Sequence, residues 1–252
     1  MKVAFWNVTG APGNATGYFS AIGAYCAICL KKEVFLSSNH LRGRRLEDYF
    51  FNDSTKSGKE KYTDSYLYGE AGYFRKLWEE NPGRQERAIT LQGIHLLAPP
   101  DLMAPFMFYH EIPEKTLYFM DLSEEMNAFS FRALEEADLV VVILPQDKTE
   151  IHNFFDHYSS IIPKALFFIA EYRKEIRDTP KDLQNLYGVE EEQICVLPYF
   201  SEFDYVCEMG AVEELFHIER TGQTKQEAAF VEAIGEIAER ITRRAEEICK
   251  IS

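Results

Sequence analysis

The sequence feature most capable of chemistry is a glycine-rich turn between two apolar segments. Residues 3–8 (VAFWNV) predict a strand, and residues 18–30 (YFSAIGAYCAICL) have the apolar periodicity of a helix. Backbone N–H groups in such a turn, with a helix N-terminus behind them, form a cradle for a phosphate. The turn comprises Gly10, Ala11, Pro12, Gly13, Asn14, Ala15, Thr16 and Gly17. It contains no lysine, which the phosphate-binding signature G-x-x-x-x-G-K-[ST] requires, so a merely tight connection is the alternative.

Two further groups of charged residues are predicted at the ends of strands. Asp121 closes the apolar segment 117–122, and its alternative role is that of an acid favoured at a helix N-terminus. The densest basic cluster follows the predicted strand 34–38 and comprises His40, Arg42, Arg44 and Arg45. It is either a solvated loop or a source of cations that grip phosphate from outside the turn.

The elements that must position these residues alternate between strand and helix. Strands are predicted at 3–8, 34–38, 94–98, 117–122, 139–144, 165–170 and 193–198. Helices are predicted at 18–30, 64–80, 101–109, 123–137, 149–158, 180–187 and 224–250. This alternation predicts an α/β fold with an open, mostly parallel twisted sheet flanked by helices. We expect one domain over residues 1–252, with a loop-rich insertion around 39–63 and a C-terminal helix that docks on the sheet or forms a dimer contact.

Composition limits the classes of function. Acidic residues number 41 and basic residues 27, a net charge of −14 that argues against general nucleic-acid binding. Cys26 and Cys29 form a C-x-x-C without the second close pair of a zinc site, so we interpret them as small core residues in a reducing compartment. Residues 3–30 carry no charge, but the polar turn divides them into pieces too short to span a membrane. The sequence therefore predicts a cytoplasmic protein without direct membrane insertion.

Several motifs, in this order, resemble the deviant P-loop ATPases of the MinD/ParA group. They are the glycine-rich turn, FMDLSEEM, ADLVVVILPQD, FFIAEY and LPYFSEFDYVCEMGAVEEL. The resemblance is closest to a divergent Gram-positive branch akin to the pilus-localising proteins TadZ and CpaE, and it covers nearly the whole chain. It implies the P-loop NTPase fold, a homodimer, and ATP and Mg²⁺ as cofactors.

The family loop KGGxGKTT falls on residues 9–16, and this chain departs from it at both lysines and at the hydroxyl that binds Mg²⁺. Thr9 replaces the signature lysine, Asn14 replaces the lysine that holds the phosphates, and Ala15 replaces the hydroxyl that binds Mg²⁺. The resemblance implies that Thr16 substitutes for that hydroxyl and that Asp121 holds Mg²⁺ through water. The family's water-orienting aspartate after the second strand is also absent, because residues 37–39 read Ser-Ser-Asn. We therefore expect little or no hydrolysis, while nucleotide binding through backbone amides survives.

The resemblance also places the nucleotide base near the ends of the last two strands. It implies contacts from Tyr172, Pro198 and Tyr199, and it places Glu171 and Tyr172 where the group often has a base-reading Asn. Tyr199 or Phe200 is a candidate for stacking on adenine, with core packing as the alternative. The nucleotide-binding set implied in full is Thr9, Gly10, Ala11, Pro12, Gly13, Asn14, Ala15, Thr16, Arg44, Arg45, Tyr172, Pro198 and Tyr199, with Thr16 and Asp121 at the metal.

The function expected from the resemblance is that of a nucleotide-binding dimeric scaffold with a degenerate P-loop. It would localise or assemble a pilus, secretion or mobile-element apparatus, whose proteins would be its partners and would recruit it to the cell pole or the inner face of the membrane. Two alternatives are an active ParA-like partitioning ATPase that binds DNA and a structural adaptor that binds no nucleotide.

Overall fold

An eight-stranded sheet forms the centre of the computed structural model, which describes residues 1–8, 14–38, 46–50, 87–91, 94–98, 116–122, 128–176, 179–217 and 224–251. The strand order is β3-β4-β2-β5-β1-β6-β7-β8. The strands are β1 (Lys2–Asn7), β2 (Val34–Ser38), β3 (Arg87–Leu91), β4 (Ile94–Ala98), β5 (Leu117–Asp121), β6 (Leu139–Leu144), β7 (Ala165–Tyr172) and β8 (Ile194–Pro198). Neighbouring strands run parallel, except that β3 is antiparallel to β4. The predicted fold class, an open and mostly parallel α/β sheet, is confirmed.

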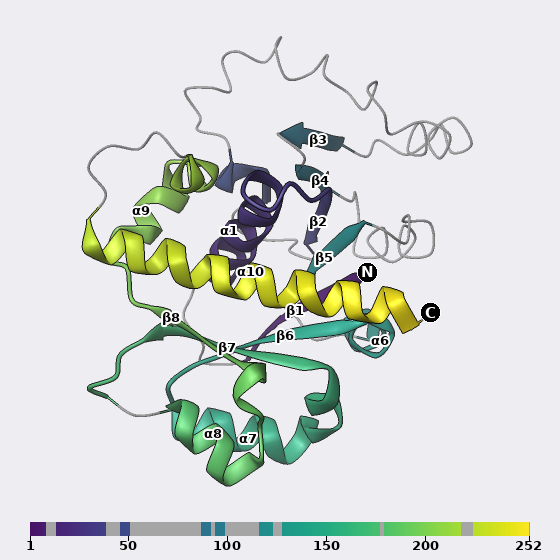
Figure 1. Ribbon diagram of the computed structural model, residues 1–252, viewed down its shortest axis with the longest axis vertical. Helices are drawn as coiled ribbons and strands as arrows, with labels where there is room; N and C mark the ends of the chain where they lie inside the picture. Colours follow the sequence, from purple (N-terminus) through teal and green to yellow (C-terminus); the bar gives the residue numbers. More distant parts are fainter. Residues whose placement is uncertain are drawn as a thin grey trace.

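Helices cover both faces of this sheet (Figure 1). The α-helices are α1 (Ala15–Ile28), α6 (Ala128–Glu136), α7 (Lys148–Tyr158), α8 (Thr179–Tyr187), α9 (Phe203–Glu208) and α10 (Lys225–Ile251). Short 3-10 turns lie at η1 (Leu46–Tyr49), η2 (Ser159–Lys164), η3 (Glu191–Gln193) and η4 (Val212–Phe216). Two elements were not predicted from the sequence. They are β3, which pairs antiparallel with β4, and α9, which follows β8.

The alternation of side chains along β1 divides the core into two layers. Val3 and Phe5 belong to the cluster that α1, α9 and α10 cover, whereas Ala4 and Trp6 belong to the cluster under α6, α7 and α8. Because a strand buried on both faces has no polar side, it reads as a continuous apolar run. Both layers are apolar, and burial of this surface supplies the main stabilisation of the sheet.

The long helix α10 lies across α1 and the amino end of β8 (Figure 1). Gly235 permits the close approach to α1, since a Cβ there would lie 2.6 Å from the hydroxyl of Tyr25. Lys32, just beyond α1, forms an ion pair with Glu246 of α10 at 3.0 Å. The docked alternative for the C-terminal helix is therefore the one observed.

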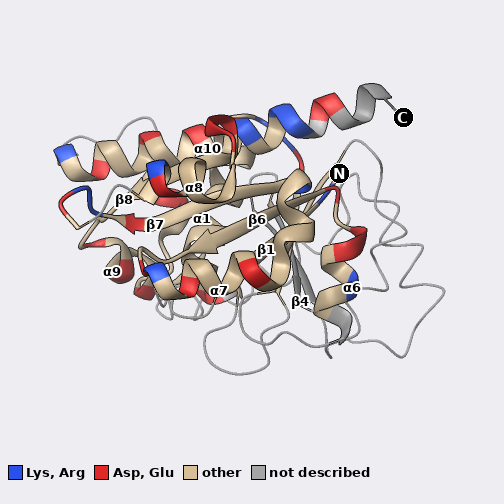
Figure 2. Ribbon diagram, turned by 90° about the horizontal axis from the view of Figure 1, so that it is seen from below, with Lys and Arg blue, Asp and Glu red and all other residues tan. Residues whose placement is uncertain are grey.

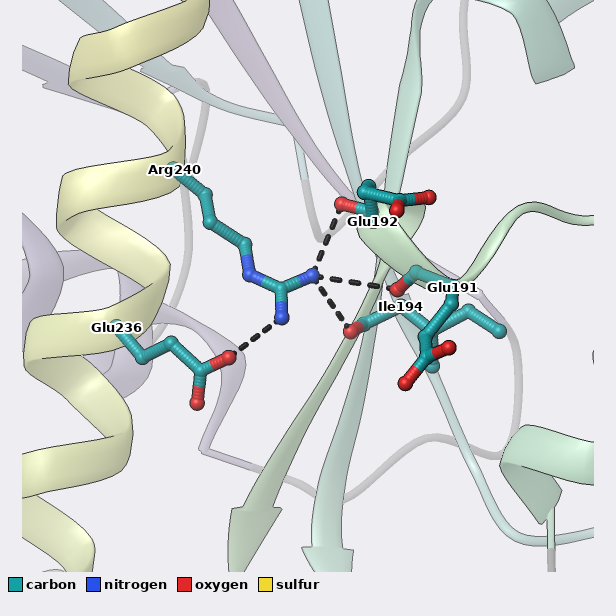
Figure 3. Close-up of polar contacts among 5 residues, drawn as sticks. All are labelled: Glu191, Glu192, Ile194, Glu236 and Arg240. Atoms are coloured by element: carbon teal, nitrogen blue, oxygen red, sulfur yellow. Dashed lines mark hydrogen bonds and ion pairs between the residues drawn. The ribbon is translucent and has the colours of Figure 1, made fainter.

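Arg240 fixes α10 to the sheet (Figure 3). Its Nη1 donates hydrogen bonds to the carbonyl oxygens of Glu191, Glu192 and Ile194 at 3.3, 2.9 and 3.0 Å, and its Nη2 bonds the carboxylate of Glu236. The guanidinium thus satisfies carbonyls of η3 and of the first residue of β8. This contact is structural, because the three carbonyls that it satisfies belong to η3 and β8.

The two cysteines of the C-x-x-C motif differ in exposure. Cys26 is buried, as predicted, and burial raises the pKa of its thiol to about 12. Cys29 is exposed, which corrects the interpretation of both as core residues. The described residues contain no group of three or more His, Cys, Asp or Glu side chains able to hold a metal ion.

Residues of both charge signs occur along the described helices (Figure 2). In α10, acidic residues predominate up to Glu239, and the basic residues Arg240, Arg243 and Arg244 follow. Among the described helices, none is long and apolar enough to cross a membrane. The predicted insertion at 39–63 and the predicted helices at 64–80 and 101–109 lie outside the described residues.

Candidate functional site

The carboxyl ends of the parallel strands meet at one edge of the sheet, which we call the carboxyl edge. At this edge β1 is followed by the glycine-rich turn and α1, while β5 ends at Asp121. Strand β1 lies between β5 and β6. The strands β2 to β5 lie on one side of β1 and the strands β6 to β8 on the other, so the direction of the strand order reverses at β1. In open α/β sheets, ligands bind outside the carboxyl ends at such a switch point.

Thr16 and Asp121 meet at this edge. The Thr16 hydroxyl donates a hydrogen bond of 2.7 Å to Oδ2 of Asp121, joining the first turn of α1 to the end of β5. Both side chains are buried, with exposed fractions of 5% and 1%. A hydroxyl and a carboxylate are oxygen ligands of the kind that Mg²⁺ prefers when water and phosphate oxygens complete its shell. The residues present therefore fit a magnesium ion bound with a phosphate ligand.

Asn14, which stands where the family has its phosphate-binding lysine, is directed elsewhere. Its amide Nδ2 donates a hydrogen bond of 2.7 Å to Oδ1 of Asp204 in α9. Asn14 is also the N-cap residue of α1, yet its side chain makes no capping bond. The Asn14 side chain therefore does not occupy the N–H groups in the first turn of α1. An anion can bind at a helix N-terminus only where such N–H groups are available to it.

Gly17 allows α1 to begin close to α9. A Cβ at this position would lie 2.4 Å from Oδ1 of Asn14 and 2.8 Å from Sγ of Cys207, distances that force a neighbour to move. The glycine thus has a packing role in the described structure, next to the turn whose glycines the sequence assigned to phosphate.

A second polar pair begins at Tyr18, two residues after Thr16 in α1. The Tyr18 hydroxyl donates a 3.2 Å hydrogen bond to Oε1 of Glu171, which is near the end of β7. The Tyr18 ring stacks on Phe203 with centroids 5.1 Å apart. Burial, followed by the charge of Glu171, raises the pKa of Tyr18 far above its usual value. The phenol therefore stays protonated and remains a donor at physiological pH.

The loop that follows Glu171 is held by Gln146. The backbone N–H of Arg173 donates to Oε1 of Gln146 at 2.7 Å, and Nε2 of Gln146 donates to the Arg173 carbonyl at 3.2 Å. The Arg173 guanidinium lies over the ring of Tyr199, 4.3 Å from its centroid. An exposed cation and an aromatic ring thus flank the ends of β7 and β8.

The structure brings some of the predicted site residues together and separates others. Thr16 and Asp121 are in contact, and Tyr172 pairs in register with Pro198 across β7 and β8. Tyr199 is 37% exposed beneath Arg173, whereas Phe200 is buried against Phe230, which removes Phe200 as a stacking candidate. Ala15 is buried at the start of α1. Thr9, Gly10, Ala11, Pro12, Gly13, Arg44 and Arg45 lie outside the described residues.

Sequence reasoning missed Gln146, Arg173 and Asp204. Gln146 is one of the first polar residues after a fully apolar strand, a signal that was available. Arg173 and Asp204 gave no such signal, because their importance comes from contacts with Tyr199 and Asn14, which are distant in sequence.

No family model and no curated protein matches this chain. Solved structures do match it in fold over almost its full length. The septum site-determining protein MinD complexed with Mg-ADP from Pyrococcus horikoshii OT3 has 11% identity and a TM-score of 0.61 and covers 97% of this chain and 99% of its own. A putative plasmid partition protein from Borrelia burgdorferi B31, bound to AMPPNP, has 10% identity and a TM-score of 0.57, covering 96% and 99%. A ParA family ATPase from Chlorobium tepidum TLS has 11% identity and a TM-score of 0.56, covering 94% and 99%.

At such low identities the likeness concerns the fold. The chain has the fold of the MinD/ParA P-loop ATPases, and the predicted P-loop NTPase architecture is thereby confirmed.

Proposed function

We propose that this protein binds a nucleoside triphosphate with Mg²⁺ at the carboxyl edge and uses it to control association rather than turnover. The observation that carries the proposal is the buried Thr16–Asp121 hydrogen bond of 2.7 Å at the start of α1. The two structural neighbours described with Mg-ADP and AMPPNP support it, since they share the fold. Thr16 would contact the metal ion directly, and Asp121 would hold it through water. Magnesium would neutralise phosphate charge, while the N–H groups at the start of α1 would orient the phosphates.

Weak hydrolysis follows from what surrounds this pair. Phosphoryl transfer depends on positioned cations and on a group that orients the attacking water. Asn14 offers no charge and is bonded to Asp204. Ser37, near the end of β2, donates its hydroxyl to that of Tyr118 at 2.9 Å, and no acid follows it in residues 38–39. We expect phosphate release well below the ordinary enzymatic range of about 1 per second.

The association proposed is that of a homodimer within a larger apparatus. By its resemblance to TadZ and CpaE, the dimer would localise or assemble pilus, secretion or mobile-element machinery from the cytoplasm. Arg44 and Arg45 are retained as proposed phosphate contacts. A DNA-coating function like that of an active partitioning ATPase is disfavoured by the net charge of −14.

A second candidate function is that of an adaptor that binds no nucleotide. The Asn14–Asp204 bond favours it, because it holds a carboxylate beside the start of α1, where a phosphate would bind. A negative charge there opposes phosphate unless the side chain rotates away or a cation intervenes.

The test is calorimetric titration of the full chain with Mg²⁺ and ATP or GTP, compared with the Asp121→Asn variant. This variant keeps the size of the side chain and removes its charge, so metal-dependent affinity should fall about tenfold or more. Asp156→Asn is the matched control, since Asp156 is exposed on α7 and forms an ion pair with His152. Thr16→Val should reproduce the loss, and Thr16→Ser should restore binding.

Saturable nucleotide binding that ignores magnesium and tolerates both substitutions would show that the Thr16–Asp121 pair is structural. Absence of any nucleotide binding to the wild-type chain would establish the adaptor instead.

A further inference from the structure

Glu171 has an unusual backbone conformation at the carboxyl edge. Its φ is +51°, in the left-handed region that residues other than glycine seldom adopt. The pairing of β7 with β8 is irregular between Ile169 and Tyr172, so Glu171 lies within a bulge. Bulges and strained residues occur together where a sheet redirects a side chain toward a functional site.

Contacts on both sides of the bulge hold Glu171 in place. Tyr18 of α1 donates to its Oε1, and Tyr18 is itself fixed by stacking on Phe203. Arg173 lies two residues after Glu171, and Gln146 forms hydrogen bonds with both its backbone N–H and its carbonyl. The side chain of Glu171 is therefore anchored to the first turns of α1, near the proposed phosphate site.

The position suits contact with the base rather than with the phosphates. Only β6 separates β7 from β1, so the two strands lie about 10 Å apart across the sheet. A nucleotide whose phosphates rest at the start of α1 can extend this far along the edge. Tyr199, which directly follows the adjacent strand β8, has an aromatic ring that is 37% exposed and lies under Arg173.

The chemistry of an ionised carboxylate restricts which base it can bind. A carboxylate only accepts hydrogen bonds, and each of its oxygens has two lone-pair sites. The bond from Tyr18 uses one site on Oε1 and leaves acceptor capacity on both oxygens. A ligand complementary to Glu171 must therefore present adjacent N–H donors.

We propose that Glu171 reads the base of the bound nucleotide and selects guanine over adenine. This inference rests on the proposed nucleotide site. Guanine presents N1–H and an N2 amino group side by side, which match the two oxygens of one carboxylate. Adenine presents an amino donor beside N1, an acceptor, so one carboxylate oxygen would face a lone pair. Glu171 is half-buried, and a carboxylate oxygen that faces a lone pair in the complex penalises the wrong ligand.

The experiment is calorimetry of the full chain with Mg²⁺ and GDP, ADP or XDP, diphosphates that avoid hydrolysis. Wild-type protein should bind GDP at least about tenfold more tightly than ADP, as expected for a matched pair of hydrogen bonds. Glu171→Gln should reduce this preference and improve XDP, because xanthine has a C2 carbonyl in place of the amino group and the new amide donates to it. Glu175→Gln, an identical change at an exposed position four residues away, should leave the GDP-to-ADP ratio unchanged.

Tyr18→Phe tests the anchoring contact without altering the carboxylate. It should lower the GDP-to-ADP ratio less than Glu171→Gln does, with the phosphate-dependent part of binding intact. This variant and the wild-type ratio decide the matter if Glu171→Gln fails to fold.

The outcomes separate the two proposals. If wild-type protein binds ADP as tightly as GDP, or if Glu171→Gln leaves the ratio unchanged, the guanine assignment is wrong while the nucleotide site stands. If none of the diphosphates and no inorganic tripolyphosphate binds, the nucleotide site itself is wrong, and the base assignment with it.

Discussion

The two edges of the sheet use polar side chains in opposite ways. At the amino edge, cations bind backbone carbonyls: Arg240 bonds three of them near the start of β8, and Lys164 bonds those of Leu134, Glu135 and Ala137 at the end of α6. At the carboxyl edge, Gln146 also bonds backbone groups, those of Arg173, but three contacts there join one side chain to another. The pairs there are Asn14–Asp204, Thr16–Asp121 and Tyr18–Glu171.

This difference separates stability from function. A cation bonded to several carbonyls completes the ends of secondary structure and cannot leave without exposing unsatisfied acceptors. A side-chain pair is able to exchange one partner for a ligand, since only its own two groups need new contacts. Substitutions at the amino edge should therefore lower the free energy of unfolding, and substitutions at the carboxyl edge should change ligand affinity.

The largest effect on stability is expected from Arg240→Met. It keeps an unbranched apolar side chain but removes every donor, and the free energy of unfolding should fall by about 2–4 kcal/mol. Denaturant titration measures this loss, with the exposed Arg243→Met on the same helix as the control. A loss confined to nucleotide affinity would contradict the separation of the two edges.

A smaller, pH-dependent effect is expected at Glu213 of η4, which belongs to neither edge. Its Oε2 is buried and has no hydrogen-bond partner among the described residues, and burial raises the pKa of this carboxyl from 4.5 to about 7. The folded chain therefore retains a proton that the unfolded chain loses, so this contribution to stability decreases as the pH rises from 4.5 to about 7.

Glu213→Gln removes that dependence. At pH 8 the variant should exceed the wild type by about 1–2 kcal/mol, after allowance for the partial exposure of Glu213. Below the pKa of the unfolded carboxyl, 4.5, the two should be nearly equal. Glu208→Gln, exposed on α9, serves as the control. Parallel stability curves across this pH range would show that Glu213 is ionised in the folded protein.

The smallest effect on stability is expected from Asp121→Asn, the variant that should affect the ligand most. Removing a buried charge offsets the loss of a charged hydrogen bond, so the free energy of unfolding should change by less than about 1 kcal/mol in the absence of nucleotide. Thermal unfolding with and without Mg²⁺ and nucleotide makes the comparison. A large loss without ligand would assign Asp121 to the frame of the sheet.

Much of this fold was predictable because its strands are apolar on both faces. A continuous apolar segment such as LVVVIL, which forms β6, is typical of a parallel strand that is buried on both faces. β3 (RAITL) was missed, since a five-residue segment at the margin of the sheet carries a weak pattern. α9 was also missed, because six residues are too few to show a helical period.

The proximity of two site residues was predictable only where both follow parallel strands of the same sheet. Thr16 and Asp121 follow strands that must end at the same edge, so their proximity could be inferred from topology. The bond of Asn14 to Asp204 could not, because no local pattern reports which side chain meets the start of α1 from 190 residues away. The bulge at Glu171 likewise depends on how β7 and β8 pair.

The packing of α10 on α1 has a consequence for biosynthesis. Roughly 200 residues separate these helices, so the ribosome needs on the order of 10–40 s to deliver the second after the first. During that interval the nascent chain presents the uncovered side of an almost wholly apolar helix, with Tyr25 and Cys26 on the surface that α10 later occupies. Folding of the α1 layer is thus delayed until late in translation, and the emerging N-terminal half is a natural client for a holding chaperone.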